Sequence, residues 1–246
     1  HSLALLISTS SVDDAQKTVM FNDLVSYVVR RAVCDITTKN LNNTFMSAVR
    51  HLSRDGVSPA TLRTFLAGPV GTLTRWPRDD EFRTALLRAP LYYGRLDAPK
   101  MRALLTELEG ELRKTRRTEE PVVPDLTALD IDHILPRSWM EYWPLSDGTF
   151  ATPAQVAAAH LAEVNGLVLT ETQAGIRRRA AAPSTLGNLS LLNLSVNRAA
   201  QNHAFLEKRR LFIRNTNLSL NVPLMTRETW DEVGIAERGE QLSAAA

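Results

Sequence analysis

The sequence has little cysteine, glycine and proline, and it has no long uninterrupted hydrophobic run. Its single cysteine, Cys34, cannot form an internal disulfide or a cysteine-based zinc site, which predicts a reducing compartment and no structural zinc. Eleven glycines and twelve prolines among 246 residues exclude a fibrous or low-complexity protein. Every apolar stretch is broken within about ten residues, which excludes a transmembrane helix. The LALLI run near the start has no small-residue cleavage site after it, so it is a poor signal peptide.

The composition is that of a globular protein. Apolar residues make up 44% of the chain and charged residues 23%, and this length predicts one or two domains. The chain starts with His1-Ser2 rather than methionine, and we therefore treat it as part of a longer protein.

Positive charge is concentrated in one segment, although the net charge of the whole chain is only +2. Between Gly175 and Asn215 there are eight basic residues and one acidic residue, Glu207, which gives a net charge of +7. The basic residues are Arg177, Arg178, Arg179, Arg198, Lys208, Arg209, Arg210 and Arg214. A polyphosphate-binding surface and an ordinary solvated surface explain this charge equally well.

The first part of the chain, residues 1–113, is predicted to be helical. One predicted helix carries an apolar stripe at helical spacing: Phe21, Leu24, Val25, Val28, Val29 and Ala32. A following helix ends at Asp55-Gly56, and Ser58-Pro59 starts another. Two more helices are predicted over residues 79–89 and 98–113.

The pattern changes after a charged, proline-containing stretch at residues 114–128, which is predicted to be a linker. Short apolar alternations predict two strands, and longer stretches predict helices and a loop. The strands cover 129–135 and 186–194, the helices 152–164 and 195–210, and the loop contains Arg177, Arg178 and Arg179. Residues 215–246 are predicted to form an extended segment and a last helix that packs back.

Asp132 and His133 are adjacent in the segment DIDHILPRS, on a predicted strand that stops at Pro136. Successive strand residues point to opposite sides of the backbone, so the carboxylate can bind a cation while the imidazole transfers a proton. Taken alone, an Asp-His pair is better explained as a structural ion pair or a cap.

A second motif, GNLSLLNLSVN at residues 187–197, changes that interpretation. A strand with Asp-His, a strand that starts with Asn-Leu and a helix with Asn, in this order, resemble the ββα-metal finger of HNH endonucleases. The matching residues are Asp132, His133 and Pro136, then Asn188 and Leu189, then Asn197. The resemblance implies a mainly α fold with a small embedded ββα-metal (HNH) finger at residues 129–214, which contains an inserted helix.

The same resemblance implies a role for each matching residue. Asp132 and Asn197 would be ligands of one Mg²⁺ or Mn²⁺ per active site, with water and a phosphate oxygen completing the shell. His133 would be the general base that takes a proton from the attacking water. Asn188 would orient the loop and the imidazole. Hydrolysis of DNA would leave 5′-phosphate and 3′-hydroxyl ends.

Two departures from the HNH pattern affect these expectations. Asn193 and Val196 stand where many HNH enzymes have zinc-binding cysteines, so packing is expected to hold the finger together. Ala200 replaces a lysine that is frequent in the helix, and Lys208 or Arg209 is expected to contact phosphate in its place.

The helix residues Asn197, Asn202, Phe205 and Lys208 resemble the C-terminal domain of GmrSD-type, modification-dependent restriction endonucleases. Residues 23–45 and 227–242 resemble helical segments of the same proteins, and phosphorothioate-sensing relatives fit equally well. The resemblance implies a cytoplasmic bacterial defence protein that acts on double-stranded DNA. It also implies an N-terminal nucleotide-hydrolysing, sensing domain, which this chain lacks because it contains no P-loop.

The predicted function is therefore a metal-dependent DNA endonuclease that nicks, because one finger addresses one phosphate at a time. Its predicted DNA contacts are Arg177, Arg178, Arg179, Arg198, Asn202, Lys208 and Arg209. The alternative is a non-catalytic DNA-binding module that keeps the finger. The presence of Asp132, His133 and Asn197 together favours the enzyme.

Overall fold

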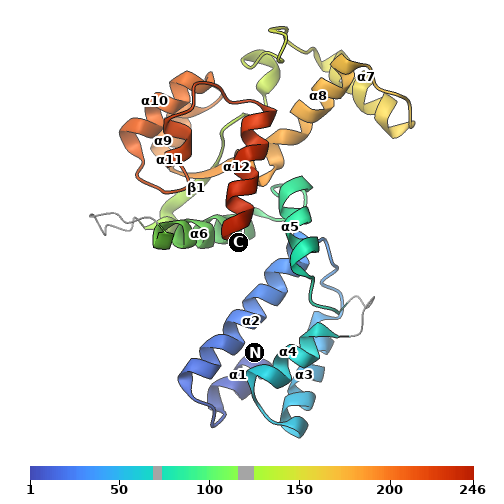
Figure 1. The fold of residues 1–246 in the computed structure, drawn as a ribbon, viewed down its shortest axis with the longest axis vertical. Coiled ribbons are helices and arrows are strands. Elements are labelled where there is room, and N and C mark those ends of the chain that lie inside the picture. The colour runs from blue at the N-terminus through green and yellow to red at the C-terminus, as the bar shows by residue number, and fades with distance from the viewer. Residues whose placement is uncertain (69–73, 116–124) are drawn as a thin grey trace. The chain divides into compact units, whose positions relative to one another are not determined.

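The protein is mainly helical with one small two-stranded sheet, as seen in a computed structural model that describes residues 1–68, 74–115 and 125–246 (Figure 1). The chain divides into two compact units, His1–Ala85 and Leu86–Ala246, and each has its own hydrophobic core. The domain boundaries expected at residues 113, 128 and 214 stay a prediction, and most of the expected linker, residues 116–124, lies outside the described residues. None of the helices in the described part of the chain combines the length and hydrophobicity that crossing a bilayer requires.

The unit formed by residues 1–85 is a small helical assembly. Its helices are α1 (Ser2–Thr9), α2 (Asp14–Val33), α3 (Leu41–Asp55), α4 (Pro59–Ala67) and the first part of α5 (Asp79–Arg88). The predicted stop at Gly56 is confirmed, as is the predicted start at Ser58-Pro59, where the Ser58 hydroxyl accepts a hydrogen bond from the Thr61 amide at 3.1 Å. Helix α1 was not predicted.

The predicted apolar stripe on α2 coincides only in part with the buried face of that helix: Phe21 and Leu24 pack, partly buried, against the core of this unit. The buried residues are Met20, Asp23, Tyr27, Arg31 and Val33, while Val25 and Val28 are 59% and 41% exposed. The charged members of the buried face are paired. Asp23 accepts two hydrogen bonds from Arg63, and Arg31 donates to the carbonyl of Thr37 at 2.6 Å.

The unit formed by residues 86–246 contains the sheet. Its α-helices after α5 are α6 (Ala98–Thr115), α7 (Pro153–Val164), α8 (Glu171–Ala181), α9 (Leu194–Ala200), α10 (Phe205–Asn215), α11 (Val222–Met225) and α12 (Glu232–Ala245). Short 3₁₀ turns are η1 (Leu126–Ala128), η2 (Trp139–Glu141), η3 (Ala182–Ser184) and η4 (Leu186–Asn188). Trp139 and Trp143 are buried in the core of this unit.

The two strands, β1 (Leu129–His133) and β2 (Leu189–Asn193), form an antiparallel pair within the predicted segments. Asp132 lies opposite Ser190, and His133 lies opposite Leu189. Helix α9 starts directly after β2, and the helices α7 and α8 are inserted between the two strands. The single helix predicted over 195–210 is wrong, because the chain breaks at Gln201, where φ is 32°, and restarts as α10.

Helix α12 packs closely on the turn η4 that leads into β2, and α6 also contacts α12 and both strands (Figure 1). A Cβ at Gly187 would lie 1.9 Å from the carbonyl oxygen of Ile235, so only glycine permits this approach. The buried Arg238 of α12 donates to the carbonyls of Gly187 at 2.6 Å, Leu189 at 2.8 Å and Leu220 at 3.0 Å. Helix α12 therefore fixes both ends of the turn before β2.

Candidate active site

A cavity of about 400 Å³ lies beside the end of β1. It brings together five of the side chains that the sequence predicts to be functional, from β1, from α9 and from the break after α9. Its lining consists of Ile131, Asp132, His133, Pro136, Arg137, Ser138, Asn197, Arg198, Gln201 and Asn202. Asp132 and His133 therefore share one cavity with Asn197, which comes more than sixty positions later in the sequence.

Asp132 is almost fully buried, with 4% of its surface exposed. The ammonium of Lys208, on α10, lies 3.3 Å and 3.5 Å from the two carboxylate oxygens, and it donates to the carbonyl of His133 at 2.7 Å. Burial raises the pKa of the Asp132 carboxyl and lowers the pKa of the Lys208 ammonium, and the attraction between the two charges opposes both shifts. This buried pair joins α10 to the end of β1.

The imidazole of His133 stacks on two tyrosines. The ring centroids of Tyr92 and Tyr93 lie 5.3 Å and 6.1 Å from that of His133. Burial, together with the positive charges of Lys208 and Arg137, lowers the pKa of His133 to about 4. Its Nε2 is buried and has no hydrogen-bond partner among the described residues. At neutral pH the imidazole is thus uncharged and has a nitrogen available for a proton.

Asn188 is completely buried and braces the loop that follows His133. Its amide oxygen accepts hydrogen bonds from the Leu135 amide at 2.7 Å and the Trp230 indole at 3.0 Å. Its amide nitrogen donates to the carbonyls of Leu135 at 2.8 Å and Pro183 at 3.1 Å. These bonds satisfy the full hydrogen-bonding capacity of the side chain. They fix the loop, and a direct effect of Asn188 on the imidazole stays a prediction.

The oxygen donors of the cavity fit a hard divalent cation. Asp132 offers a carboxylate, and the half-buried Asn197 offers an amide oxygen from α9. In the described part of the chain no group of three or more His, Cys, Asp and Glu side chains is arranged to hold a metal ion. Mg²⁺ typically takes only one or two carboxylates and completes its shell with water and phosphate oxygens, which this donor set allows.

The three arginines predicted to lie in a loop are instead on helix α8, and this expectation is wrong. Arg177 pairs with Glu163 at 2.5 Å. Arg179 is buried, pairs with Glu232 and donates to the carbonyls of Trp143 and Pro144. The burial of Arg179 argues against a direct DNA contact, because its guanidinium is fully used inside the protein.

The remaining predicted DNA contacts are placed differently. Lys208 is buried against Asp132, and Arg209 donates to the carbonyl of Met225 at 2.8 Å. Arg198 is exposed and Asn202 half-buried, and both line the cavity. The structure thus leaves Arg198 and Asn202 nearest to where a substrate of His133 would lie.

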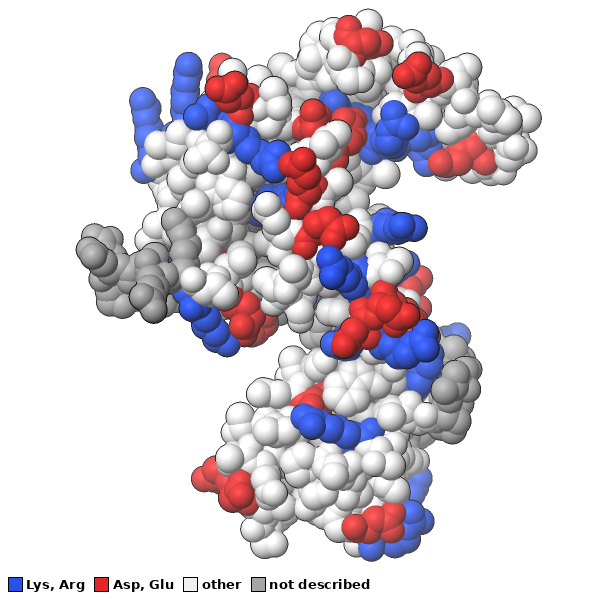
Figure 2. All heavy atoms as spheres, in the orientation of Figure 1, with Lys and Arg blue, Asp and Glu red and all other residues white. Residues whose placement is uncertain are grey.

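The concentration of positive charge seen in the sequence does not persist in the fold. Three of the eight basic residues of the segment 175–215 form ion pairs with acidic residues from elsewhere in the chain. The pairs are Arg177 with Glu163, Arg179 with Glu232, and Lys208 with Asp132. On the face of residues 86–246 drawn in Figure 2, basic and acidic side chains are interspersed.

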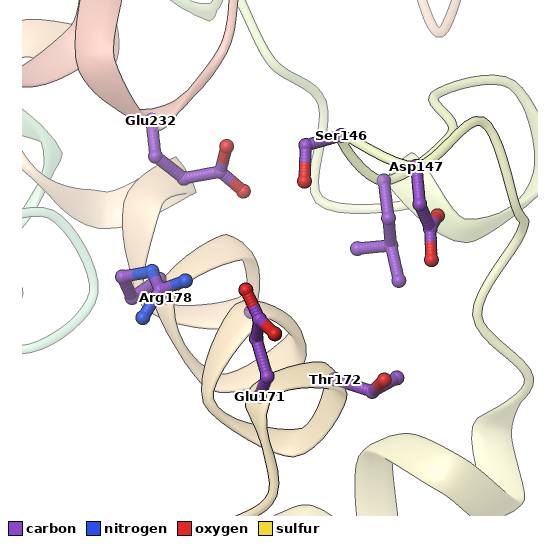
Figure 3. A pocket seen from close by; sticks show the side chains of 8 residues that line it. Ser146, Asp147, Glu171, Thr172, Arg178 and Glu232 are labelled. Atoms are coloured by element: carbon purple, nitrogen blue, oxygen red, sulfur yellow. The ribbon is translucent and has the colours of Figure 1, made fainter.

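A second cavity, of about 280 Å³, lies beside α8 (Figure 3). Arg178 and Glu171 extend into it from α8, Glu232 from the start of α12, and Ser146 and Asp147 from the loop before α7. Arg178 thus faces a cavity that also contains three carboxylates. The amino-acid sequence did not predict this cavity.

Three residues near His133 were also not predicted: Tyr92, Tyr93 and Arg137. Burial, with a further contribution from Tyr93, raises the pKa of Tyr92 to about 12, so its hydroxyl stays protonated at neutral pH. The adjacent tyrosines belong to the segment between α5 and α6, and no pattern links that segment to a motif forty residues later. Arg137 lies within DIDHILPRS and lines the cavity, so its place next to the motif was the available signal.

Comparison with known proteins gives one match. A family described as GmrSD restriction endonucleases, C-terminal domain, matches residues 76–245, which confirms the resemblance found in the helix residues around Asn197. The matched range starts after residues 23–45, so the likeness of that segment stays a prediction. No curated protein and no solved structure matches the chain.

Proposed function

The chain belongs to the GmrSD restriction endonuclease C-terminal domain family, and from this premise we propose that it is a metal-dependent HNH endonuclease that hydrolyses DNA phosphodiester bonds. It would act as the effector part of a modification-dependent restriction or anti-phage defence protein. A nucleotide-hydrolysing sensing domain would direct it to its target.

The observation that carries this proposal is the cavity shared by Asp132, His133 and Asn197. The antiparallel pair β1–β2 followed by α9 supports an HNH finger, because it has the strand, strand, helix order of that motif. The buried, unpartnered Nε2 of His133 supports general-base chemistry at the same cavity.

In the proposed reaction, Nε2 of His133 accepts a proton from a water molecule as its oxygen attacks phosphorus. The bond from phosphorus to the 3′-oxygen breaks, and that oxygen takes up a proton, which leaves 5′-phosphate and 3′-hydroxyl ends. The negative charge of a bound phosphate would raise the pKa of His133 from about 4 toward neutrality and make it a stronger base. Asp132 and Asn197 would hold a Mg²⁺ or Mn²⁺ ion, which supplies Lewis-acid stabilisation of negative charge on the phosphate.

The direct test is cleavage of supercoiled plasmid with Mg²⁺ or with EDTA. We expect His133→Ala to lose about 10²–10⁴-fold in rate, the typical contribution of a general base, with folding and DNA affinity retained. His203→Ala is the matched control, because His203 is half exposed, pairs with Glu207 and is not among the residues that line the cavity. Cleavage by His133→Ala at the wild-type rate would reject the assignment, and binding without cleavage by the wild type would favour the non-catalytic DNA-binding module.

The metal ligands can be tested in the same assay. Asp132→Ala and Asn197→Ala should both need more Mg²⁺ for half-maximal cleavage, because each removes one proposed oxygen ligand. Zinc chelators should leave the protein folded, since a thiolate zinc site cannot form from one cysteine. Stoichiometric, tightly bound zinc in the purified protein would contradict this expectation.

The form of the product tests whether one site acts alone. A single finger addresses one phosphate at a time, so open-circle plasmid should appear first and linear plasmid only as nicks accumulate. Linear product at the earliest time points, without an open-circle intermediate, would show that both strands are cut together.

A further inference from the structure

An aromatic stack lies beside the candidate base, and one of its rings is open to solvent. Tyr92 is 7% exposed, and its ring stacks with both His133 and Tyr93, whose centroids lie 5.3 Å and 4.0 Å from that of Tyr92. The Tyr93 ring is parallel to the imidazole within 2°, yet 64% of this residue is exposed. A large aromatic side chain is thus presented to solvent next to the proposed site of chemistry.

The backbone holds Tyr93 in an unusual conformation. Its φ of 62° is in the left-handed region, which bulky residues rarely adopt. The loop is fixed by hydrogen bonds from the amides of Leu91 and Tyr92 to the carbonyl of Ser184, at 2.8 Å and 3.2 Å. A Cβ at Gly94 would lie 2.0 Å from the carbonyl oxygen of Pro90, so the turn is as tight as glycine permits. Strained residues that their surroundings hold in place are concentrated at functional sites.

Arg137 lies over the exposed ring of Tyr93. Its guanidinium carbon lies 4.9 Å from the centroid of the Tyr93 ring, and its side chain is exposed and lines the cavity of His133. No ion pair joins Arg137 to an acidic residue in the described ranges of the chain. An exposed aromatic ring together with an arginine is the combination by which proteins bind single-stranded nucleic acid.

We propose that Tyr93 and Arg137 form a nucleotide-binding subsite that takes an unpaired nucleotide next to the scissile phosphate. Tyr93 stacks on the base, and Arg137 contacts a backbone phosphate. The subsite rests on the proposed nuclease function, and it adds a preference for DNA in which a base is free to leave the helix. Stacking does not read the identity of the base, because every base has an aromatic face.

Binding to fluorescently labelled single-stranded DNA in EDTA tests the subsite without cleavage. Asparagine tolerates the left-handed conformation, so Tyr93→Asn removes the ring without straining the loop. We expect this variant to lose about 5- to 150-fold in affinity, the usual range for loss of a stacked base. Tyr93→Phe should bind like the wild type. Tyr142→Asn is the matched control, because Tyr142 is 51% exposed but, unlike Tyr93, is not stacked on His133 or covered by Arg137.

A second probe separates stacking from charge. An oligonucleotide of the same length made only of abasic sites keeps the phosphates and lacks the bases, so Tyr93→Asn should bind it like the wild type. Arg137→Ala should instead reduce the log–log salt slope by about 0.7 on single strands with bases, which is the value for one phosphate contact.

Each outcome bears on one hypothesis. Wild-type affinity of Tyr93→Asn for the normal strand would overturn the subsite. So would an equal loss on the abasic strand, or a lower kcat with unchanged affinity, because the ring would then serve only to pack against His133. A Tyr93-dependent affinity in a protein that does not nick plasmid would support the subsite and reject the proposed nuclease.

Discussion

The two cavities of the unit formed by residues 86–246 contain charged groups of both signs, but they differ in what surrounds those groups. In the cavity of about 400 Å³, Asp132 is buried with Lys208, and the Nε2 of His133 is buried without a partner. In the cavity of about 280 Å³, Asp147, Glu171 and Arg178 are exposed. Burial of the charged groups, rather than their number, therefore distinguishes the candidate site from the second cavity. Water screens exposed charges, whereas buried groups must be paired or change protonation state.

The largest expected effect comes from breaking the buried pair. Lys208→Met should lower the free energy of unfolding by about 3–5 kcal/mol, because it leaves Asp132 as an uncompensated buried charge. Arg178→Met, in the other cavity, should change it by less than about 0.5 kcal/mol. Urea denaturation in EDTA measures both. The double variant Asp132→Asn/Lys208→Met should recover much of the loss, and a Lys208→Met protein as stable as the wild type would refute the importance of burial.

The support beneath His133 gives the next largest effect. Asn188→Ala removes four hydrogen bonds and leaves buried backbone groups of Leu135 and Pro183 unpaired, which should cost about 3–4 kcal/mol. Asn217→Ala changes an exposed asparagine of the same unit and should cost little. Equal stability of the two variants in urea denaturation would mean that the loop after His133 does not depend on this side chain.

The pH dependence of stability tests the burial of the imidazole itself. The folded pKa of His133, about 4, is below the ordinary value of 6.5, so the unfolded chain takes up a proton first as the pH falls. The stability that the neutral imidazole contributes is therefore present above pH 6.5 and is lost between pH 6.5 and 4, by at most about 3 kcal/mol. Unfolding in EDTA across this range should show the loss in the wild type and in His203→Asn, but a smaller one in His133→Asn. Parallel pH profiles for all three proteins would indicate a solvated imidazole.

The smallest expected effect concerns DNA affinity. Arg198 is exposed at the candidate site, so Arg198→Ala should weaken binding to all duplexes alike and reduce the log–log salt slope by roughly 0.9. Arg177→Ala should change the slope less, because Arg177 is already paired with Glu163. A loss of affinity confined to one DNA sequence would mean that Arg198 recognises bases. An unchanged salt slope would mean that Arg198 belongs to an ordinary solvated surface.

The sequence predicts the candidate site better than it predicts the rest of the fold. Asp132, His133, Asn188 and Asn197 were identified through the resemblance to the HNH finger, and the structure brings Asp132, His133 and Asn197 to one cavity. The helix α8 was missed although Thr170 and Gln173 form a capping box, a signal that is readable from the sequence. The break at Gln201 was missed because no glycine or proline marks it.

Hydrophobic periodicity failed where charged residues are buried in pairs. On α2 the buried face contains Asp23, whose partner Arg63 lies forty residues later in the chain. The same limitation hid the burial of Arg179 and Lys208, because Glu232 and Asp132 are distant in sequence. Long-range pairing of charges, rather than local propensity, decides these positions, and a single sequence does not reveal it.

Because α12 contacts Gly187, the turn before β2 is completed only after α12 has been synthesised. His133 leaves the ribosome long before Arg238, yet Arg238 holds the carbonyls of Gly187 and Leu189 on either side of Asn188. A nascent chain therefore carries the whole DIDHILP motif while the turn that supports it is still unanchored.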